Sequence, residues 1–155
     1  MTLDDYLEIG VTVPIGSYVF TAERIKAFAA KYDPQRFHMD EKQAEHSVFG
    51  RLCASGWQTA AAWMKCNLAT PAHGDRPWNG DGPEPEFGPS PGFSNMKWLK
   101  PVYAGETVSY TRTILGHRPM STRPGWRLVS LRSEGFDSTG DKVIEFDSAV
   151  LVKVE

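Results

Sequence analysis

The sequence predicts an α+β fold in which an antiparallel sheet wraps around a long central helix. Residues 56–69 are apolar and rich in good helix formers, as expected for a buried helix. The C-terminal part of the chain alternates apolar and polar residues with the period of β-strands, and turn-forming residues separate these stretches. A chain of 155 residues suits one domain, so we expect a single domain over residues 1–155.

The N-terminal part is predicted to contain one strand and two helices. The strand should cover residues 17–20, and Thr21 can cap the helix that follows it. This helix should end before Asp33, because a residue that precedes proline avoids the α conformation. A short second helix should begin after Asp40, where Gln43 has the spacing of a capping box.

The third helix, over residues 56–69, is the predicted centre of the domain. Ser55 can cap its first free N–H groups, and its apolar circumference predicts burial on most sides. Cys53 and Cys66 lie beside and inside this helix. A helix would separate them by about 20 Å, whereas a disulfide requires Cα atoms within roughly 7 Å. We therefore expect two buried, reduced thiols.

A segment rich in proline and glycine follows the helix. Residues 71–92 contain six prolines and five glycines, a density that excludes regular structure across the whole stretch. One interpretation is a solvated insertion. The other is a loop that borders the entrance of a substrate pocket, with Trp78 and Phe87 as apolar contacts, because long loops in compact domains are often functional.

Four strands should form the rest of the sheet. They are expected over residues 93–99, 107–115, 126–136 and 142–154, with a turn between the last two. Alternation places two sets of side chains on one face of their strands: Val108, Tyr110, Arg112 and Ile114 in the second, and Ile144, Phe146, Val150, Val152 and Val154 in the fourth.

Charge and hydropathy exclude several classes of function. Seventeen basic and nineteen acidic residues give a net charge of −2, which provides no electrostatic footprint for nucleic acid or an anionic membrane. No apolar run approaches the roughly 20 residues that span a bilayer. The acidic residues 1–5 do not resemble an export signal, so we expect a cytoplasmic protein.

Possible acid–base chemistry is concentrated in residues 32–40, the link between the first two predicted helices. Asp33 and His38 are five residues apart, and Pro34 constrains the turn between them. A carboxylate beside an imidazole can hold one water, and either group can accept its proton and return one. From this spacing alone, a capping aspartate and a packed or solvated histidine remain the alternative. His38, Asp40 and His46 lack the partner motif of a metal site, so we expect no metal.

Gly56 begins the predicted central helix. The first N–H groups of a helix lack internal partners and carry its positive dipole end. They can therefore polarise a carbonyl on which negative charge develops, and glycine allows close approach of a ligand. The alternative is that Gly56 only permits tight packing near the cap.

Three segments of the chain resemble, in order, the motifs of MaoC-like dehydratases and (R)-specific enoyl-CoA hydratases. They are the Asp33 to His38 pair, residues 49–57 leading into the central helix, and the strand–turn block of residues 90–107. The resemblance covers roughly residues 15–154. It implies a hot-dog fold, in which an antiparallel sheet wraps around a central helix, and this agrees with the fold predicted from periodicity.

The resemblance also implies a reaction, the interconversion of a 2-enoyl and a 3-hydroxyacyl thioester of coenzyme A or acyl-carrier protein. It assigns catalysis to Asp33 and His38 and binding of the carbonyl oxygen to the Gly56 amide. It requires no cofactor, because coenzyme A is part of the substrate, and it implies a homodimer or a larger even assembly. We expect the residues beside these positions to contact the substrate: Tyr32, Phe37, Ser55, Trp57, Pro91 and Gly92.

The chain departs from the family pattern in two places. Members commonly have Asn-Pro shortly before the histidine, whereas here Pro34 directly follows the aspartate, and Met64 occupies a position where some members have serine. Two other functions are considered beside this one, and the first is disfavoured by the sequence. A hot-dog thioesterase commonly carries a carboxylate on the central helix, and residues 56–69 contain none. A module that binds acyl thioesters without turnover is the other alternative.

Overall fold

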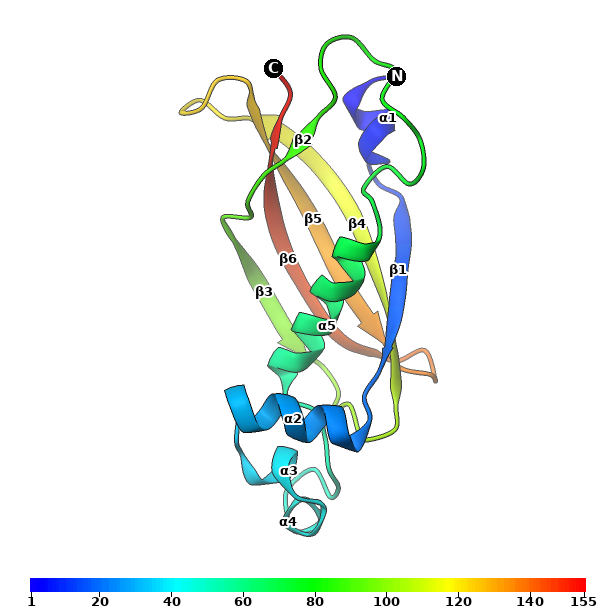
Figure 1. Ribbon diagram of the computed structural model, residues 1–155, viewed down its shortest axis with the longest axis vertical. Helices are drawn as coiled ribbons and strands as arrows, with labels where there is room; N and C mark the ends of the chain where they lie inside the picture. The colour runs from blue at the N-terminus through cyan, green and yellow to red at the C-terminus, as the bar shows by residue number, and fades with distance from the viewer.

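An antiparallel sheet of six strands forms most of the computed structural model, which describes residues 1–155. Its order is β1-β4-β5-β6-β2, and β3 also pairs with β6. The sheet curls around helix α5 (Gly56–Ala69), which confirms the predicted hot-dog fold (Figure 1). The strands are β1 (Thr12–Val19), β2 (Glu86–Phe87), β3 (Gly92–Trp98), β4 (Thr107–Pro119), β5 (Trp126–Phe136) and β6 (Lys142–Lys153).

The remaining helices gather at the two ends of α5. Three of them lie near its N-terminus, and the fourth lies near its C-terminus together with the loop of residues 71–92 (Figure 1). None of the helices combines the length and apolar character needed to cross a bilayer. The four are α1 (Leu3–Leu7), α2 (Ala22–Tyr32), α3 (Arg36–Met39) and α4 (Glu41–Glu45).

The capping residues define the helices as predicted. Thr21 accepts a hydrogen bond from the Arg24 amide, and Ser55 accepts one from the Trp57 amide, so α2 and α5 begin where expected. The first strand was predicted too short. It begins at Thr12 instead of residue 17, because β1 pairs with β4 through an irregularity near Pro14 that obscures its alternation. The short elements α1, α3 and β2 were not predicted.

Burial along the strands follows the predicted alternation in β4. Val108, Tyr110 and Ile114 point into the core, and Arg112 lies on the same face with only 6% of its surface exposed. In β6 the alternation is weaker, because Val143 on the opposite face is also buried. Both cysteines are buried free thiols, as predicted.

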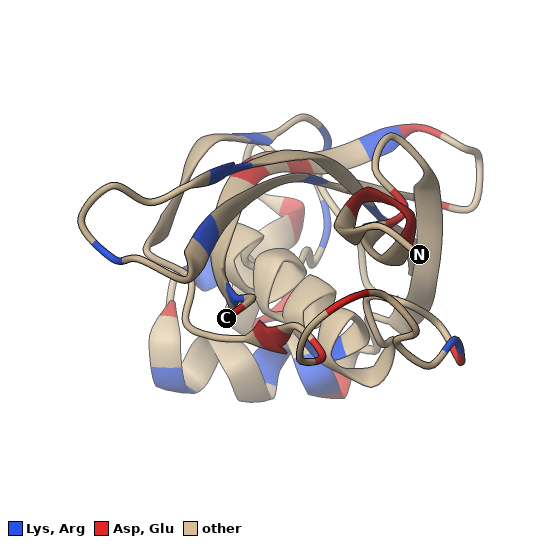
Figure 2. Ribbon diagram, turned by 90° about the horizontal axis from the view of Figure 1, so that it is seen from above, with Lys and Arg blue, Asp and Glu red and all other residues tan.

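Helix α5 is less enclosed than the sequence predicts. The sheet covers the face that carries Ala62 and Trp63, which are 4% and 2% exposed. A stripe on the opposite side stays open, where Trp57, Met64 and Leu68 are 51%, 44% and 78% exposed. Seen from above, α5 lies inside the curve of the sheet, and basic and acidic residues are interspersed around the ribbon (Figure 2). The curled sheet of one chain therefore covers only part of an all-round apolar helix.

The loop of residues 71–92 is anchored to α1. The Tyr6 ring stacks on His73 with centroids 4.7 Å apart and meets Trp78 edge-on at 5.3 Å. The Tyr6 hydroxyl also donates a hydrogen bond to Glu84. Although it is rich in proline and glycine, the segment is thus packed against the N-terminus rather than being a free insertion.

Candidate active site

Asp33 and His38 converge where α2 gives way to α3. Asp33 is the C-cap of α2, and the short helix α3 brings the His38 side chain back toward it. Nε2 of His38 lies 3.4 Å from Oδ2 of Asp33, and His38 is only 5% exposed. The structure therefore brings together the two residues that their spacing singled out.

A backbone carbonyl sets the tautomer of His38. Nδ1 lies 2.6 Å from the carbonyl oxygen of Cys53. A carbonyl oxygen can only accept a hydrogen bond, so Nδ1 carries the hydrogen of the neutral ring. Nε2 then presents its lone pair toward Asp33. The Cys53 thiol lies beside the ring, but burial raises its pKa to about 11, so it is protonated at neutral pH.

Two donors hold the Asp33 carboxylate. The Ser55 hydroxyl donates to Oδ2 at 2.7 Å, and the Gln35 amide donates to Oδ1 at 2.7 Å. Burial raises the pKa of Asp33, but the hydrogen bonds from Ser55 and Gln35 and the proximity of His38 outweigh it and leave the pKa below its ordinary value. Asp33 is therefore ionised at neutral pH, and its Oδ2 faces Nε2 of His38.

Gly56 shares a cavity with this pair. The cavity has a volume of about 410 Å³, and Asp33, His38 and Gly56 all line it. Gly56 begins α5, and its N–H has no acceptor within the chain. A Cβ atom at this position would collide with the indole of Trp98, so a larger residue could be accommodated only if the indole moved. A carboxylate, an imidazole and the N-terminus of a helix therefore border the same space.

The other expected substrate contacts lie in different places. Phe37 and Trp57 line the cavity. Ser55 is fully buried and binds Asp33 instead of lining the space. Tyr32 is 70% exposed and borders a separate hollow between α2 and α5, because its ring packs on Phe28, away from Asp33.

Pro91 and Gly92 lie outside this cavity. They border hollows near the start of β3, and no residue of the loop 71–92 lines the cavity that holds Asp33 and His38 in the same chain. The reason is the length of α5, whose 14 residues extend over about 20 Å between the two regions. Within one chain, this loop therefore lies away from the cavity that Asp33 and His38 line, and its place at a substrate entrance stays a prediction.

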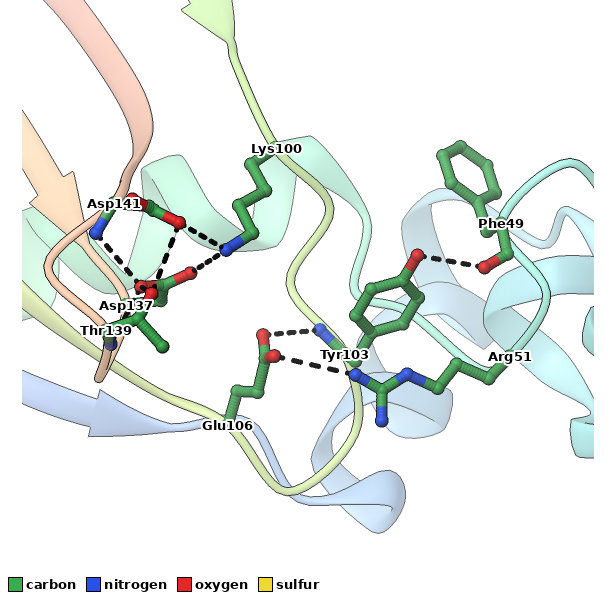
Figure 3. A network of polar contacts seen from close by, with 8 residues as sticks. All are labelled: Phe49, Arg51, Lys100, Tyr103, Glu106, Asp137, Thr139 and Asp141. Carbon is green, nitrogen blue, oxygen red and sulfur yellow. Dashed lines mark hydrogen bonds and ion pairs between the residues drawn. The ribbon is translucent and has the colours of Figure 1, made fainter.

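Two polar clusters hold residues that line the cavity, and Figure 3 shows their contacts. Lys100, which lines the cavity, donates hydrogen bonds to Asp137 at 2.7 Å and Asp141 at 2.8 Å in the turn between β5 and β6. On the other side, the Tyr103 hydroxyl donates to the carbonyl of Phe49, another lining residue. These contacts join segments far apart in sequence, and no local motif indicates them.

Arg51 and Glu106 extend the second cluster. The Arg51 guanidinium lies 3.7 Å from Glu106 and 4.0 Å from the centre of the Tyr103 ring. Glu106 accepts a hydrogen bond from the Tyr103 amide. No group of three or more histidine, cysteine, aspartate or glutamate side chains is arranged to hold a metal ion.

Solved structures share this architecture over nearly the whole chain. An (R)-hydratase from A. caviae involved in PHA biosynthesis superimposes with a TM-score of 0.68 at 21% identity, covering 96% of this chain and 98% of the other. The (R)-hydratase PhaJ1 from Pseudomonas aeruginosa gives a TM-score of 0.70 at 19% identity, with 96% and 84% covered. These two likenesses show the shared fold.

Other known proteins are similar to this chain in amino-acid sequence over its whole length. No family model matches the chain. The uncharacterized protein YdeM of Bacillus subtilis (strain 168) is 28% identical over 153 residues, 99% of each chain. A MaoC-like dehydratase from Rhodospirillum rubrum is 31% identical, with a TM-score of 0.76 over 100% of this chain and 98% of its own. With this identity along the entire sequence and the hot-dog architecture, the chain belongs to the MaoC-like dehydratase family.

Proposed function

We propose that this protein is a hydratase or dehydratase that interconverts a 2-enoyl thioester and a 3-hydroxyacyl thioester. One observation carries the proposal: Nε2 of His38 lies 3.4 Å from the ionised Asp33 carboxylate, in a cavity that Gly56 also lines. In the neutral ring, Nε2 is an acceptor like the carboxylate, so a donor that lies between or beside them is favoured. A water molecule, or the hydroxyl of a 3-hydroxyacyl group, supplies such donors.

The geometry supports acid–base catalysis without a cofactor. In hydration, the water oxygen forms a bond to C3 of the enoyl group while one of its protons passes to Asp33 or His38. Electron density moves to the thioester oxygen, which the Gly56 N–H at the positive end of α5 stabilises. A proton from the pair then reaches C2 and completes the 3-hydroxyacyl product. Dehydration follows the same steps in reverse, and coenzyme A belongs to the substrate.

The alternatives are weaker. A thioesterase with its carboxylate on the central helix is disfavoured, because α5 contains no aspartate or glutamate. A module that only binds thioesters would not require an ionised Asp33 held by two donors beside a histidine whose tautomer is fixed.

A panel of 2-enoyl-CoA substrates tests the proposal directly. Hydration removes the conjugated double bond, so the enoyl absorbance should fall on addition of protein. Asp33→Asn and His38→Ala should each slow this change by roughly 100- to 10,000-fold. Release of free thiol without loss of the enoyl group would instead indicate a thioesterase, and binding without either change would indicate a non-catalytic module.

The proposal includes a homodimer. The open stripe of α5, formed by Trp57, Met64 and Leu68, is apolar, and Trp98 of β3 lies beside it with 47% of its surface exposed. Strand β3 pairs only with β6, so its other edge has free backbone donors and acceptors. A second copy can cover the stripe and pair with this edge. Sedimentation analysis should show a dimer, and Leu68→Glu should shift it toward monomer, while Lys31→Glu on α2 should not.

A further inference from the structure

A second cavity lies between the C-terminal half of α5 and the inner face of the sheet. Its volume is about 450 Å³, within the range of roughly 300–1,000 Å³ typical of small-molecule sites. It shares no lining residue with the catalytic cavity. Its walls are mainly apolar side chains, including Trp63, Phe93, Ile114, Val129, Leu131 and Phe146.

One charged side chain lines this apolar space. Arg112 of β4 borders the cavity although only 6% of the residue is exposed. Its hydrogen-bond partners are all neutral: the side-chain oxygen of Asn67 at 2.6 Å and the carbonyls of Thr70 and Pro71, both at 3.2 Å. These contacts close the C-terminal end of α5, but none of them neutralises the guanidinium.

The carboxylate whose charge acts on Arg112 is already engaged. Glu8 lies 3.1 Å from Arg76 and forms its ion pair there. Burial lowers the pKa of Arg112, and the more distant Glu8 charge opposes this shift, but a guanidinium remains charged at neutral pH. A buried cation without a counter-ion is costly, so the cavity favours an anion.

The guanidinium also has donors to spare. Nη1 donates to Asn67 and Thr70 and Nη2 donates once to Pro71, so Nε–H and the second hydrogen of Nη2 have no acceptor in the chain. Nε and Nη2 form one edge of the planar group, and such an edge binds a carboxylate through parallel hydrogen bonds. An apolar cavity with Arg112 in its wall matches a ligand with an aliphatic body and a carboxylate end.

We propose that this cavity binds an aliphatic carboxylate, with its chain against the apolar walls and its carboxylate paired with Arg112. The ligand can be a free fatty acid or the distal carboxylate of a longer acyl group, because both present the same chemistry. The proposal requires no turnover, so it can be tested whether or not the protein hydrates enoyl thioesters.

Calorimetric titration of the intact protein with octanoate, and with 1-octanol as the uncharged match, tests the site without any mutation. Octanoate should bind at least roughly 10-fold more tightly, because hydrogen bonds to a charged partner account for the difference. Equal binding of the two probes, or no binding of octanoate, would overturn the proposal and leave Arg112 as a cap of α5.

Variants then locate the bound carboxylate. Arg112→Gln should abolish the preference for octanoate, and Arg112→Lys should restore part of it. Ala149→Leu should weaken both probes by filling the cavity, whereas Arg132→Gln on the outer face of β5 and His38→Ala in the catalytic cavity should change neither. Thermal unfolding identifies any variant that has lost the fold. Octanoate binding that depends on His38 and not on Arg112 would place the ligand in the other cavity and refute the assignment.

The effect of octanoate on the KM of long and short enoyl thioesters shows whether the carboxylate belongs to the acyl chain or to a separate fatty acid. If the ligand is the far end of the acyl chain, octanoate should raise the KM of long-chain enoyl thioesters competitively and leave the KM of short ones unchanged. If it is a separate fatty acid, octanoate should bind without competition against either. Arg112-dependent octanoate binding is the expected result in both cases.

Discussion

The Ser55 hydroxyl donates a hydrogen bond of 2.7 Å to the Asp33 oxygen that lies 3.4 Å from Nε2 of His38. Ser55 also caps α5 through the Trp57 amide, so one buried hydroxyl joins the central helix to the acid–base pair. Its position places it outside the cavity, and we expect it to act on the substrate only through Asp33.

Ser55→Ala should therefore change the pH profile of the reaction. Loss of the donor raises the pKa of Asp33, and protonation of Asp33 removes an acceptor, so the acidic limb of kcat should move to higher pH. The lost cap should also reduce the free energy of unfolding by about 1 kcal/mol. Ser55→Thr keeps the hydroxyl and should restore the limb. Reduced stability with an unchanged pH profile would show that Ser55 is only a cap.

Asp33 and His38 should behave as one unit. If they act on the same water, the double variant Asp33→Asn/His38→Ala should lose little more turnover than either single variant, because groups that act together are non-additive. The measurement is kcat/KM for all four proteins with one enoyl thioester. If the fold-loss in kcat/KM of the double variant equals the product of the two single fold-losses, the residues have independent roles.

Gly56→Ala should act through Trp98. The added Cβ collides with the indole, and overpacking of this kind costs roughly 1–3 kcal/mol. In a Trp98→Ala background the same change should cost much less, since contacting sites are coupled. Chemical denaturation of the four proteins gives the coupling energy. An equal cost in both backgrounds would mean that the backbone conformation, not the indole, selects glycine.

Trp78→Ala should separate stability from catalysis. Trp78 contacts Tyr6 at the end of α5 opposite the cavity that Asp33 and His38 line, so its loss should lower the free energy of unfolding by about 1–3 kcal/mol. Within the stable temperature range, kcat for a short enoyl thioester should stay within a factor of two of wild type, as a rough bound. A loss comparable to that of Asp33→Asn would show that the loop of residues 71–92 reaches a catalytic site, for example that of a second copy.

Asp137 should contribute stability that depends on pH. Its hydrogen bonds from Lys100 and Thr139 hold the pKa of the carboxyl well below its ordinary value. The contribution is complete above the unfolded pKa of about 4 and is lost as the pH falls through the lower folded value. Asp137→Asn should thus lower Tm at pH 7, and the difference should shrink under strongly acidic conditions. Asp75→Asn on the exposed loop is the matched control and should change Tm little at any pH.

Local signals in the sequence predicted most of the fold. Caps at Thr21 and Ser55 and the strict alternation of β4 depend on neighbours in the chain, so they could be read directly. The exposed stripe of α5 could not, because composition predicts that an apolar helix face will be covered but not what covers it. Short elements such as α3, with four residues, carry too little periodicity to detect.

The candidate site divides in the same way. Asp33 and His38 are joined by one short turn, so their spacing predicted their meeting. The contacts that orient them come from Ser55 and the Cys53 carbonyl, 22 and 15 residues away, and only the folded chain brings these close. Arg112 was assigned correctly to an inward face, yet no pattern in the sequence indicated that a cavity would form beside it.

The carbonyl that fixes the protonated nitrogen of His38 belongs to the main chain of Cys53. Any residue at position 53 supplies the same carbonyl oxygen, so a change of side chain alone cannot move the hydrogen from Nδ1 to Nε2 of His38. Substitutions at position 53 therefore do not change which nitrogen of His38 carries the hydrogen. The backbone on both sides of Cys53 is held by hydrogen bonds from the Ala54 amide to the Val102 carbonyl and from the Ala104 amide to the Leu52 carbonyl. Only a change in the path of this backbone would remove the acceptor from Nδ1 of His38.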